Sequence, residues 1–232
     1  MRIYRLQIRL IQLSVLLTVI VLVSGFMGAW GSNQKKPDNV SNQDKIELPS
    51  GTVTIKGNTK IVALGDSFTY GYPEGPEKSW PEKLAKGLQV TVVNKGKSYQ
   101  TARDLLSRFD QDVIAEQPGR VIIFIGTGDA LQGVSLKDYQ SNIQAMIDKS
   151  RSNHITPILA LPLPYPNVQK SIKEMREWLL GYAQSQQILT LDFATVLMDQ
   201  ENKYLPGLSK DGKYPTEKGY QVMAEYAIRV LK

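Results

Sequence analysis

Cysteine is absent from the 232-residue chain, and histidine occurs only once, at position 154. The lack of cysteine excludes disulfide bonds, thiolate metal sites and a cysteine nucleophile. It says little about the compartment, because many exported proteins also lack cysteine. No cluster of metal-ligand residues stands out in the sequence, and we expect neither a metal nor a cofactor.

Acidic residues are missing from the N-terminal end of the chain. Residues 1–37 carry five basic side chains and no acidic one, so they supply five of the six net positive charges. The remainder is nearly neutral and has no basic stripe interleaved with aromatic residues. The positive charge therefore does not predict a nucleic-acid partner.

The same N-terminal region contains a long uncharged run. Residues 10–30, "LIQLSVLLTVIVLVSGFMGAW", number about 21, which at about 1.5 Å per residue spans a hydrocarbon core of about 30 Å. Arg2, Arg5 and Arg9 precede the run and predict a cytoplasmic N-terminus with the body outside. We favour an uncleaved signal anchor that spans the membrane. A cleaved signal peptide, followed by secretion, is the alternative.

Changes of composition divide the chain into three parts. Residues 1–31 form the predicted cytoplasmic stub and transmembrane anchor. Residues 32–59 form a predicted polar linker, in which "TVTI" (52–55) is expected to form a short edge strand. Residues 60–232 form the predicted folded domain. Its apolar residues alternate between short runs and helical stripes, and we find no internal repeat.

Five short apolar runs predict buried strands, and stripes with helical spacing separate them. The expected strands are 60–65, 90–96, 120–126, 157–164 and 188–193, and the expected helices include 79–88, 102–116, 136–147, 172–182 and a last helix capped by Thr216. Alternation of this kind predicts a doubly wound α/β domain whose five-stranded parallel sheet is covered on both faces. In such sheets the ligand crevice lies at the carboxyl ends of the strands.

Several short motifs follow these strands. The first strand ends in "LGDSFTYGY", which places Ser67 in a tight turn beside backbone N–H groups that can bind an anion. The second ends in "NKGKSYQT" and the third in "GTGDA", and "DGKYPT" (211–216) precedes the last helix. A serine in such a turn is also a common helix cap, so "GDS" alone does not identify a nucleophile.

Taken together, these stretches resemble the SGNH hydrolases, also called GDSL-type esterases and lipases. "IVALGDSFTYGY" resembles the first block of that family, "VVNKGKSYQTARDLL" the second, "IIFIGTGDA" the third and "DGKYPTEKGY" the last. The resemblance covers about residues 60–232 and implies a flavodoxin-like sheet. It also implies hydrolysis of an acyl ester, carried by a lipid or an acetylated glycan.

The resemblance also assigns roles to site residues. It implies that Ser67 is the nucleophile, that the N–H groups of Ser67 and Gly96 are oxyanion donors, and that Asp211 is the acid of the triad. Asp66 belongs to the retained binding site. Asp129 is expected to orient the loop after the third strand.

Two positions depart from the family pattern. Gly128 stands where the family has the asparagine of Gly-x-Asn-Asp, and Tyr214 replaces the histidine of Asp-x-x-His. A phenol has a pKa near 10, so Tyr214 hardly accepts the proton of Ser67 at neutral pH. We expect that restoring His at 214 and Asn at 128 together raises the rate.

Substitute bases are few. His154 precedes the fourth strand and is expected about 20 Å from the crevice, given about 3.3 Å of rise per strand residue. Lys210 or Lys213 would have to be desolvated to act as a base, and Asp211 would act directly only as a weak one. Three interpretations stay open: a weakened hydrolase, a non-catalytic domain that binds an acyl, glycan or lipid ligand, and a scaffold that binds other partners.

Overall fold

The computed structural model describes residues 57–232. The predicted anchor, most of the predicted linker and the strand expected over residues 52–55 lie outside this range. None of the helices within residues 57–232 combines the length and the apolar character that a membrane crossing requires.

The sheet has five parallel strands: β1 (Ile61–Gly65), β2 (Val92–Gly96), β3 (Arg120–Phe124), β4 (Thr156–Ala160) and β5 (Leu189–Leu191). Their spatial order is β2-β1-β3-β4-β5, which confirms the predicted five-stranded parallel sheet. Gly65 pairs with Gly96 on one side and with Phe124 on the other. The carboxyl ends of β1, β2 and β3 therefore stand at one level, and the segments that follow them meet there.

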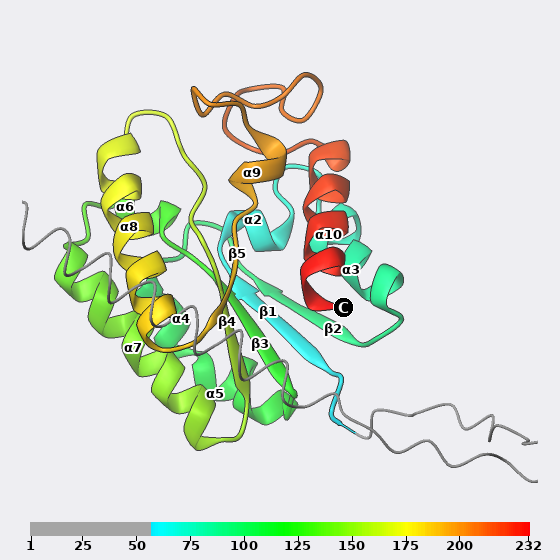
Figure 1. Ribbon diagram of the computed structural model, residues 1–232, viewed down its shortest axis with the longest axis vertical. Helices are drawn as coiled ribbons and strands as arrows, with labels where there is room; N and C mark the ends of the chain where they lie inside the picture. The colour runs from blue at the N-terminus through cyan, green and yellow to red at the C-terminus, as the bar shows by residue number, and fades with distance from the viewer. Residues whose placement is uncertain (1–56) are drawn as a thin grey trace, which may run out of the picture. The chain divides into compact units, whose positions relative to one another are not determined.

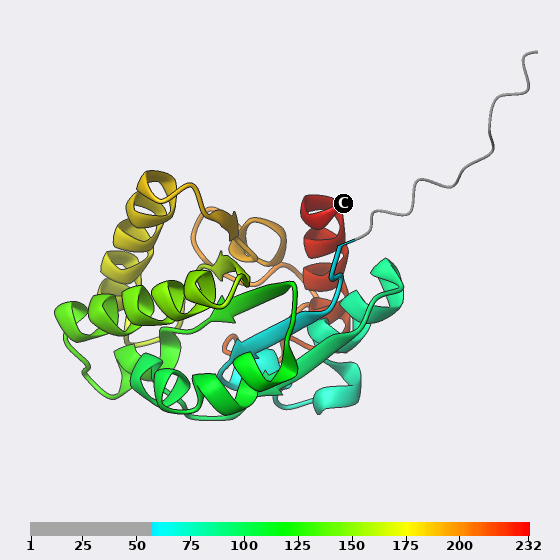
Figure 2. The same cartoon turned by 90° about the horizontal axis from the view of Figure 1, so that it is seen from below.

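Helices cover both faces of the sheet (Figures 1 and 2). One face is covered by α4 (Ala102–Ser107), α5 (Phe109–Asp112), α7 (Leu136–Ser152) and α8 (Gln169–Ser185), and the other by α2 (Ser67–Tyr70), α3 (Trp80–Leu88), α9 (Ala194–Leu197) and α10 (Glu217–Leu231). The short α6 (Thr127–Leu131) follows β3, and single 3₁₀ turns are η1 (Pro76–Lys78) and η2 (Ile114–Glu116).

Alternate residues of each strand supply the two cores. In β1, Val62 and Leu64 pack on the face of α4 and α7, whereas Ile61 and Ala63 pack on the face of α3 and α10. All four are fully buried, as expected for a strand with helices on both sides.

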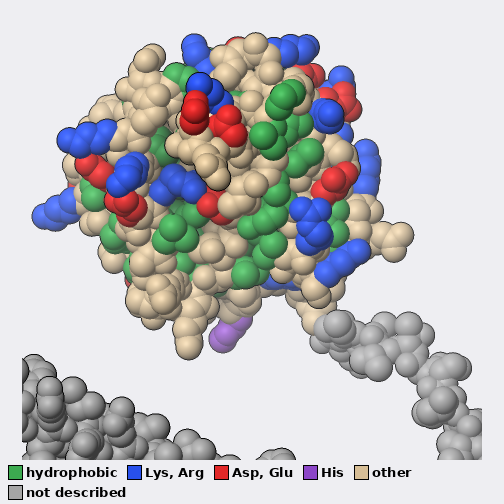
Figure 3. Space-filling view, turned by 45° about the horizontal axis from the view of Figure 1, so that its top comes forward, with side chains coloured by type: hydrophobic (Ala, Val, Ile, Leu, Met, Phe, Trp, Pro, Cys, Tyr) green, Lys and Arg blue, Asp and Glu red, His purple; other side chains and the backbone are tan. Residues whose placement is uncertain are grey.

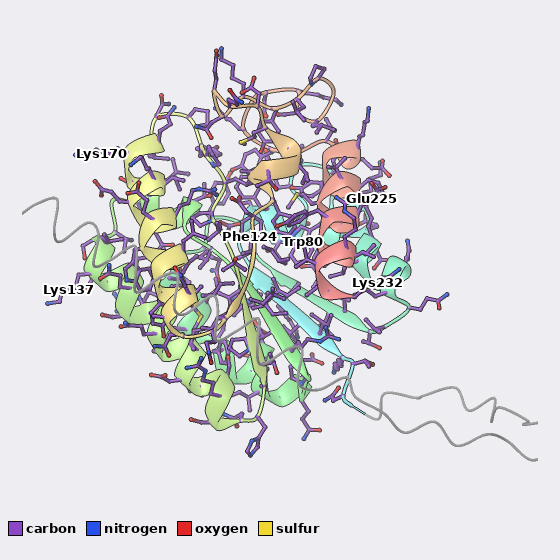
Figure 4. The ribbon with its side chains drawn as sticks, viewed as in Figure 1. Trp80, Phe124, Lys137, Lys170, Glu225 and Lys232 are labelled. Carbon is purple, nitrogen blue, oxygen red and sulfur yellow. The ribbon has the colours of Figure 1, made fainter. Side chains whose placement is uncertain are left out.

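An aromatic group fills the space between the sheet and α10. Phe193 lies between Trp80 and Phe124, with ring centroids 5.4 and 5.3 Å away, and Figure 4 shows Trp80 and Phe124 inside the fold. Tilted aromatic pairs at this distance add to the stability gained by burial.

One predicted helix is broken. Residues 102–116 form α4, α5 and η2 instead of one continuous helix, and the backbone leaves helical geometry at Arg108 and Val113. The Arg108 guanidinium turns inward and donates hydrogen bonds to the carbonyl oxygens of Lys95 (3.0 Å) and Gly65 (3.2 Å). It also pairs with Asp112. Because these partners are distant in the sequence, the helical stripe did not reveal the break.

All five strands are shorter than predicted, β4 and β5 the most, and one predicted cap is confirmed. β4 ends at Ala160 although the apolar run extends to residue 164, because Pro162 and Pro164 have no N–H to donate to a neighbouring strand. β5 ends at Leu191, before Asp192 and Phe193. Thr216 caps α10 by accepting a hydrogen bond from the Gly219 N–H.

Replacement of Arg108 by alanine is expected to lower the free energy of unfolding by about 2–4 kcal/mol, since it leaves a buried carboxylate and two carbonyls with fewer partners. Urea unfolding measures the change. Lys149→Ala removes the solvent-exposed pair with Asp110 and should cost less than about 1 kcal/mol. Equal losses in the two variants would contradict this role of Arg108.

Candidate active site

Ser67 begins α2 immediately after β1 and is 7% exposed. The Asp66 carboxylate caps the helix by accepting a hydrogen bond from the Phe68 N–H over 3.0 Å. A Cβ on Gly65 would lie 2.5 Å from the carbonyl oxygen of Phe124, so the turn before Ser67 requires glycine. The "GDS" sequence thus packs the end of β1 against β3 and presents the hydroxyl at the sheet edge.

The N–H of Tyr99 donates a hydrogen bond to the Ser67 Oγ over 3.3 Å. Tyr99 lies in the loop after β2 and has a left-handed backbone conformation, with φ of +62°. Its ring is 74% exposed. The backbone N–H of Tyr99 therefore contacts the candidate nucleophile, which the sequence pattern did not reveal, because a tyrosine gives no signal for a left-handed turn.

Gly96 does not take the predicted role of oxyanion donor. Its N–H donates to the side chain of Asn94 over 2.9 Å, and the Tyr99 N–H stands beside Ser67 in its place. Gly96 has a packing role instead, because a Cβ there would lie 2.1 Å from the backbone nitrogen of Tyr70. The backbone N–H that lies beside Ser67 is thus three residues further along the loop than expected.

The phenol of Tyr214 lies beside Ser67, so the structure brings these two predicted residues together. Its ring packs against Phe68, Tyr72 and Tyr165, with centroids 5.2, 4.8 and 5.7 Å away. Burial raises the pKa of Tyr214 above its usual value and the neighbouring Tyr165 raises it further, while a hydrogen-bonding contact with Ser67 acts in the opposite direction. The phenol therefore stays protonated at neutral pH.

Asp211 is engaged within its own loop. Its carboxylate accepts hydrogen bonds from the N–H groups of Lys213 (2.8 Å) and Tyr214 (3.0 Å) and from the Ser209 hydroxyl (3.2 Å). Partial burial acts to raise the pKa of Asp211, but these hydrogen bonds outweigh it and hold the pKa below its usual value. Among residues 57–232, Ser67 is not a hydrogen-bond partner of Asp211.

The other candidate bases lie elsewhere. Lys210 and Lys213 are exposed. His154 lies in an exposed turn directly before β4, at the end of the sheet opposite Ser67, and is drawn in purple in Figure 3. The part of the chain that the structure describes therefore brings no imidazole to the nucleophile. It also holds no group of three or more acidic or histidine side chains arranged for a metal ion.

Two buried carboxyl groups lie near the base of the site. Burial, together with the proximity of Asp129, raises the pKa of Asp66 to about 7, although the hydrogen bond from the Phe68 N–H acts to lower it. Burial likewise raises the pKa of Asp129 to about 6 against the hydrogen bonds from the Ala102 N–H. Both carboxyl groups accept hydrogen bonds from backbone N–H donors and not from Ser67, so their first role is to organise the loops.

Ser67 opens into a small pocket of about 70 Å³, lined by Asp66, Ser67, Phe68, Tyr99, Thr127, Gly128, Leu131, Gln132 and Tyr214. This is less than half of a cavity of about 150 Å³ that holds benzene. The solvent-exposed side chains of Tyr99 and Leu131 contribute apolar surface to the pocket. Figure 3, which brings the top of Figure 1 forward, shows hydrophobic side chains gathered among charged ones.

The model of the GDSL-like lipase/acylhydrolase family matches residues 63–222. The chain belongs to this family. The match spans the first strand, the Ser67 turn and the Tyr214 loop, so it covers the segments that build the site.

Similar proteins agree with this assignment. A solved structure from Desulfitobacterium hafniense DCB-2, assigned to the G-D-S-L family of lipolytic proteins, is 61% identical, with a TM-score of 0.74 over 75% of this chain and 99% of the other. An arylesterase of Vibrio mimicus is 27% identical over 76% of this chain and 90% of its own length. An uncharacterised lipoprotein of Bacillus subtilis (strain 168) is 32% identical over 47% of this chain and 50% of its own length.

The buried carboxyl of Asp66 gives the GDSL-family domain a predictable pH dependence. Its pKa is about 7 in the folded protein, against 3.8 as the ordinary value, so the folded state holds the proton more tightly. This contribution to stability is present at acid pH and is lost as the pH rises toward 7.

We expect Asp66→Asn, which keeps an acceptor for the Phe68 N–H, to stabilise the protein at about pH 8 by up to about 4 kcal/mol. Little change is expected near pH 4. Thermal unfolding at both pH values measures the effect. The matched control is Asp112→Asn, since Arg108 and Lys97 lower the pKa of Asp112 against the effect of burial; that variant should lose stability at pH 8. A loss in both variants at pH 8 would contradict the prediction.

Proposed function

We propose that this GDSL-family protein hydrolyses esters of small acyl groups slowly, with Ser67 as the nucleophile. The observation that carries the proposal is the Ser67 hydroxyl itself. It accepts a hydrogen bond from the Tyr99 N–H, opens into a pocket of about 70 Å³ and has a phenol for a neighbour where the family has an imidazole. The pocket size favours acetyl or similarly short acyl chains.

In the first step, the Ser67 oxygen bonds to the ester carbonyl carbon, and the N–H groups of Tyr99 and Ser67 stabilise the negative charge that develops on the carbonyl oxygen. The bond to the alcohol oxygen then breaks, and the alcohol leaves with a proton. Water hydrolyses the acyl-serine, which releases the acid and restores the hydroxyl. The net reaction consumes one ester and one water and yields one acid and one alcohol.

The rate is limited by the fate of the Ser67 proton. The neutral phenol of Tyr214 can donate to the serine oxygen but is a poor acceptor, so solvent has to remove the proton. In a comparable serine hydrolase, loss of the triad histidine lowers turnover by about a million-fold, while backbone donors and binding still provide about 10³–10⁴ over water. Slow but measurable turnover is the expected result.

The proposal includes a location outside the cytoplasm. The basic residues before the uncharged run at residues 10–30 support a membrane anchor with the domain on the outer side. The similarity to a bacterial lipoprotein is consistent with an extracytoplasmic role. A secreted form produced by cleavage of the run is the alternative.

A non-catalytic binding domain is the second candidate function. The retained nucleophile and its backbone donor favour catalysis over binding alone, because a binding pocket does not require a hydroxyl placed beside an N–H. Labelling of Ser67 by a fluorophosphonate distinguishes the two functions, since only a nucleophilic serine displaces fluoride from the reagent.

Tyr214→His is expected to raise kcat for 4-nitrophenyl acetate by about 10–100-fold, because it supplies an acceptor of suitable pKa beside Ser67. Steady-state kinetics on the purified protein measures the change. Tyr214→Phe removes only the phenol oxygen and should change kcat by less than about threefold, since that oxygen is not the base.

Ser67→Ala is the background control for this series and should abolish the protein-dependent rate. Loss of turnover in Tyr214→Phe would show that the phenol has a chemical role and would contradict the proposed limit on the rate. A fast wild-type rate that depends on Ser67 would also contradict the proposed limit on the rate.

A further inference from the structure

Helix α6 and the residue after it hold the loop that carries the Tyr99 N–H. The side-chain amide of Gln132 donates a hydrogen bond to the carbonyl oxygen of Tyr99 over 3.1 Å. The fully buried carboxylate of Asp129 accepts the Ala102 N–H with both oxygens, at 3.0 and 3.1 Å. Two side chains of this segment thus bind the loop on either side of residues 100 and 101.

Gly128 provides a third contact with the same loop. A Cβ built on Gly128 would lie 2.0 Å from the carbonyl oxygen of Gln100 and 2.9 Å from its carbonyl carbon. Both are backbone atoms, which cannot move aside as the end of a flexible side chain would. An asparagine at this position therefore does not fit while the loop stays where it is, which argues against including it in the expected double change with His at 214.

The conformation of Tyr99 explains why the loop needs to be held. A left-handed backbone is unfavourable for a residue with a Cβ, and such a conformation persists only where surrounding contacts enforce it. The ring of Tyr99 is 74% exposed, so ring packing provides little of that support. The contacts that remain are on its backbone: the carbonyl oxygen on Gln132 and the N–H on Ser67.

We infer that Gly128, Asp129 and Gln132 form a latch that fixes the Tyr99 N–H against Ser67, with Gln132 as a positioning residue for this oxyanion donor. Because glycine stands at position 128 where the family has asparagine, a side-chain amide is missing there and the loop can approach α6. The effect of the latch on rate rests on the proposed function, whereas its effect on the loop does not.

The first test replaces Gln132, which is exposed, by methionine, which keeps the side-chain length and removes the donor. Misplacement of the Tyr99 N–H should lower kcat for 4-nitrophenyl acetate by about tenfold or more, with KM changed by less than about twofold. Amide hydrogen exchange at Tyr99, followed by NMR, should become about tenfold faster because the N–H leaves its acceptor.

Two variants control this test. Gln132→Lys supplies a donor of similar reach and should restore part of the kcat and of the Tyr99 protection. Gln144→Met makes the same chemical change at an exposed position of α7 and should leave both measurements as in the wild type.

The second test is Gly128→Asn, which should lower kcat and speed Tyr99 exchange because the loop is forced away from α6. Its matched control is Gly133→Asn. Unlike Gly128, Gly133 has a left-handed backbone, with φ of +68°, and no atom lies within 4 Å of an added Cβ; asparagine tolerates that conformation well.

Each outcome decides the inference. Unchanged Tyr99 exchange in Gln132→Met, or a higher kcat in Gly128→Asn, would overturn the latch. Faster exchange in Gln132→Met with an unchanged kcat would overturn the positioning role. If the wild type neither hydrolyses the ester nor is labelled at Ser67, the proposed function fails, and the exchange measurement still decides whether the latch exists.

Discussion

The hydrogen bond from the Tyr99 N–H to the Ser67 Oγ joins the turn after β1 to the loop after β2, and α6 after β3 holds that loop in place. Strand order makes this possible, because β1 lies between β2 and β3 and pairs with both through Gly65. The Arg108 guanidinium joins the ends of β1 and β2 by donating hydrogen bonds to the carbonyl oxygens of Gly65 and Lys95. The site is therefore a property of three neighbouring strand ends and not of one motif.

In this geometry, oxyanion stabilisation and proton transfer depend on different groups of the site. In the proposed mechanism, the backbone N–H groups of Tyr99 and Ser67 stabilise the oxyanion, and their contribution does not depend on ionisation. Proton transfer is altered, since Tyr214 stands where the family has histidine, and burial raises the pKa of its phenol. On the proposed function, the domain keeps the family fold and uses Ser67 as its nucleophile, and its turnover is limited by proton removal.

The sequence predicted the strands and the covered sheet because β1 and β3 are apolar on both faces, a pattern that only a buried parallel strand needs. It did not predict the break at Arg108, whose partners lie on distant strands, nor the role of Tyr99, since a left-handed tyrosine has no signature in the sequence. Gly96 was expected to carry the second oxyanion donor on the strength of residue type. In the structure its missing side chain makes room for Tyr70 instead.

The dependence of the wild-type esterase rate on pH, measured with 4-nitrophenyl acetate from about pH 5 to pH 9, tests most directly whether Ser67 lacks a proton acceptor. If solvent removes the proton, kcat/KM rises continuously with hydroxide concentration and shows no inflection in the neutral range. An inflection at an apparent pKa of about 6–7 would contradict this, because it would show that a protein group such as the buried carboxyl of Asp66 accepts the proton of Ser67.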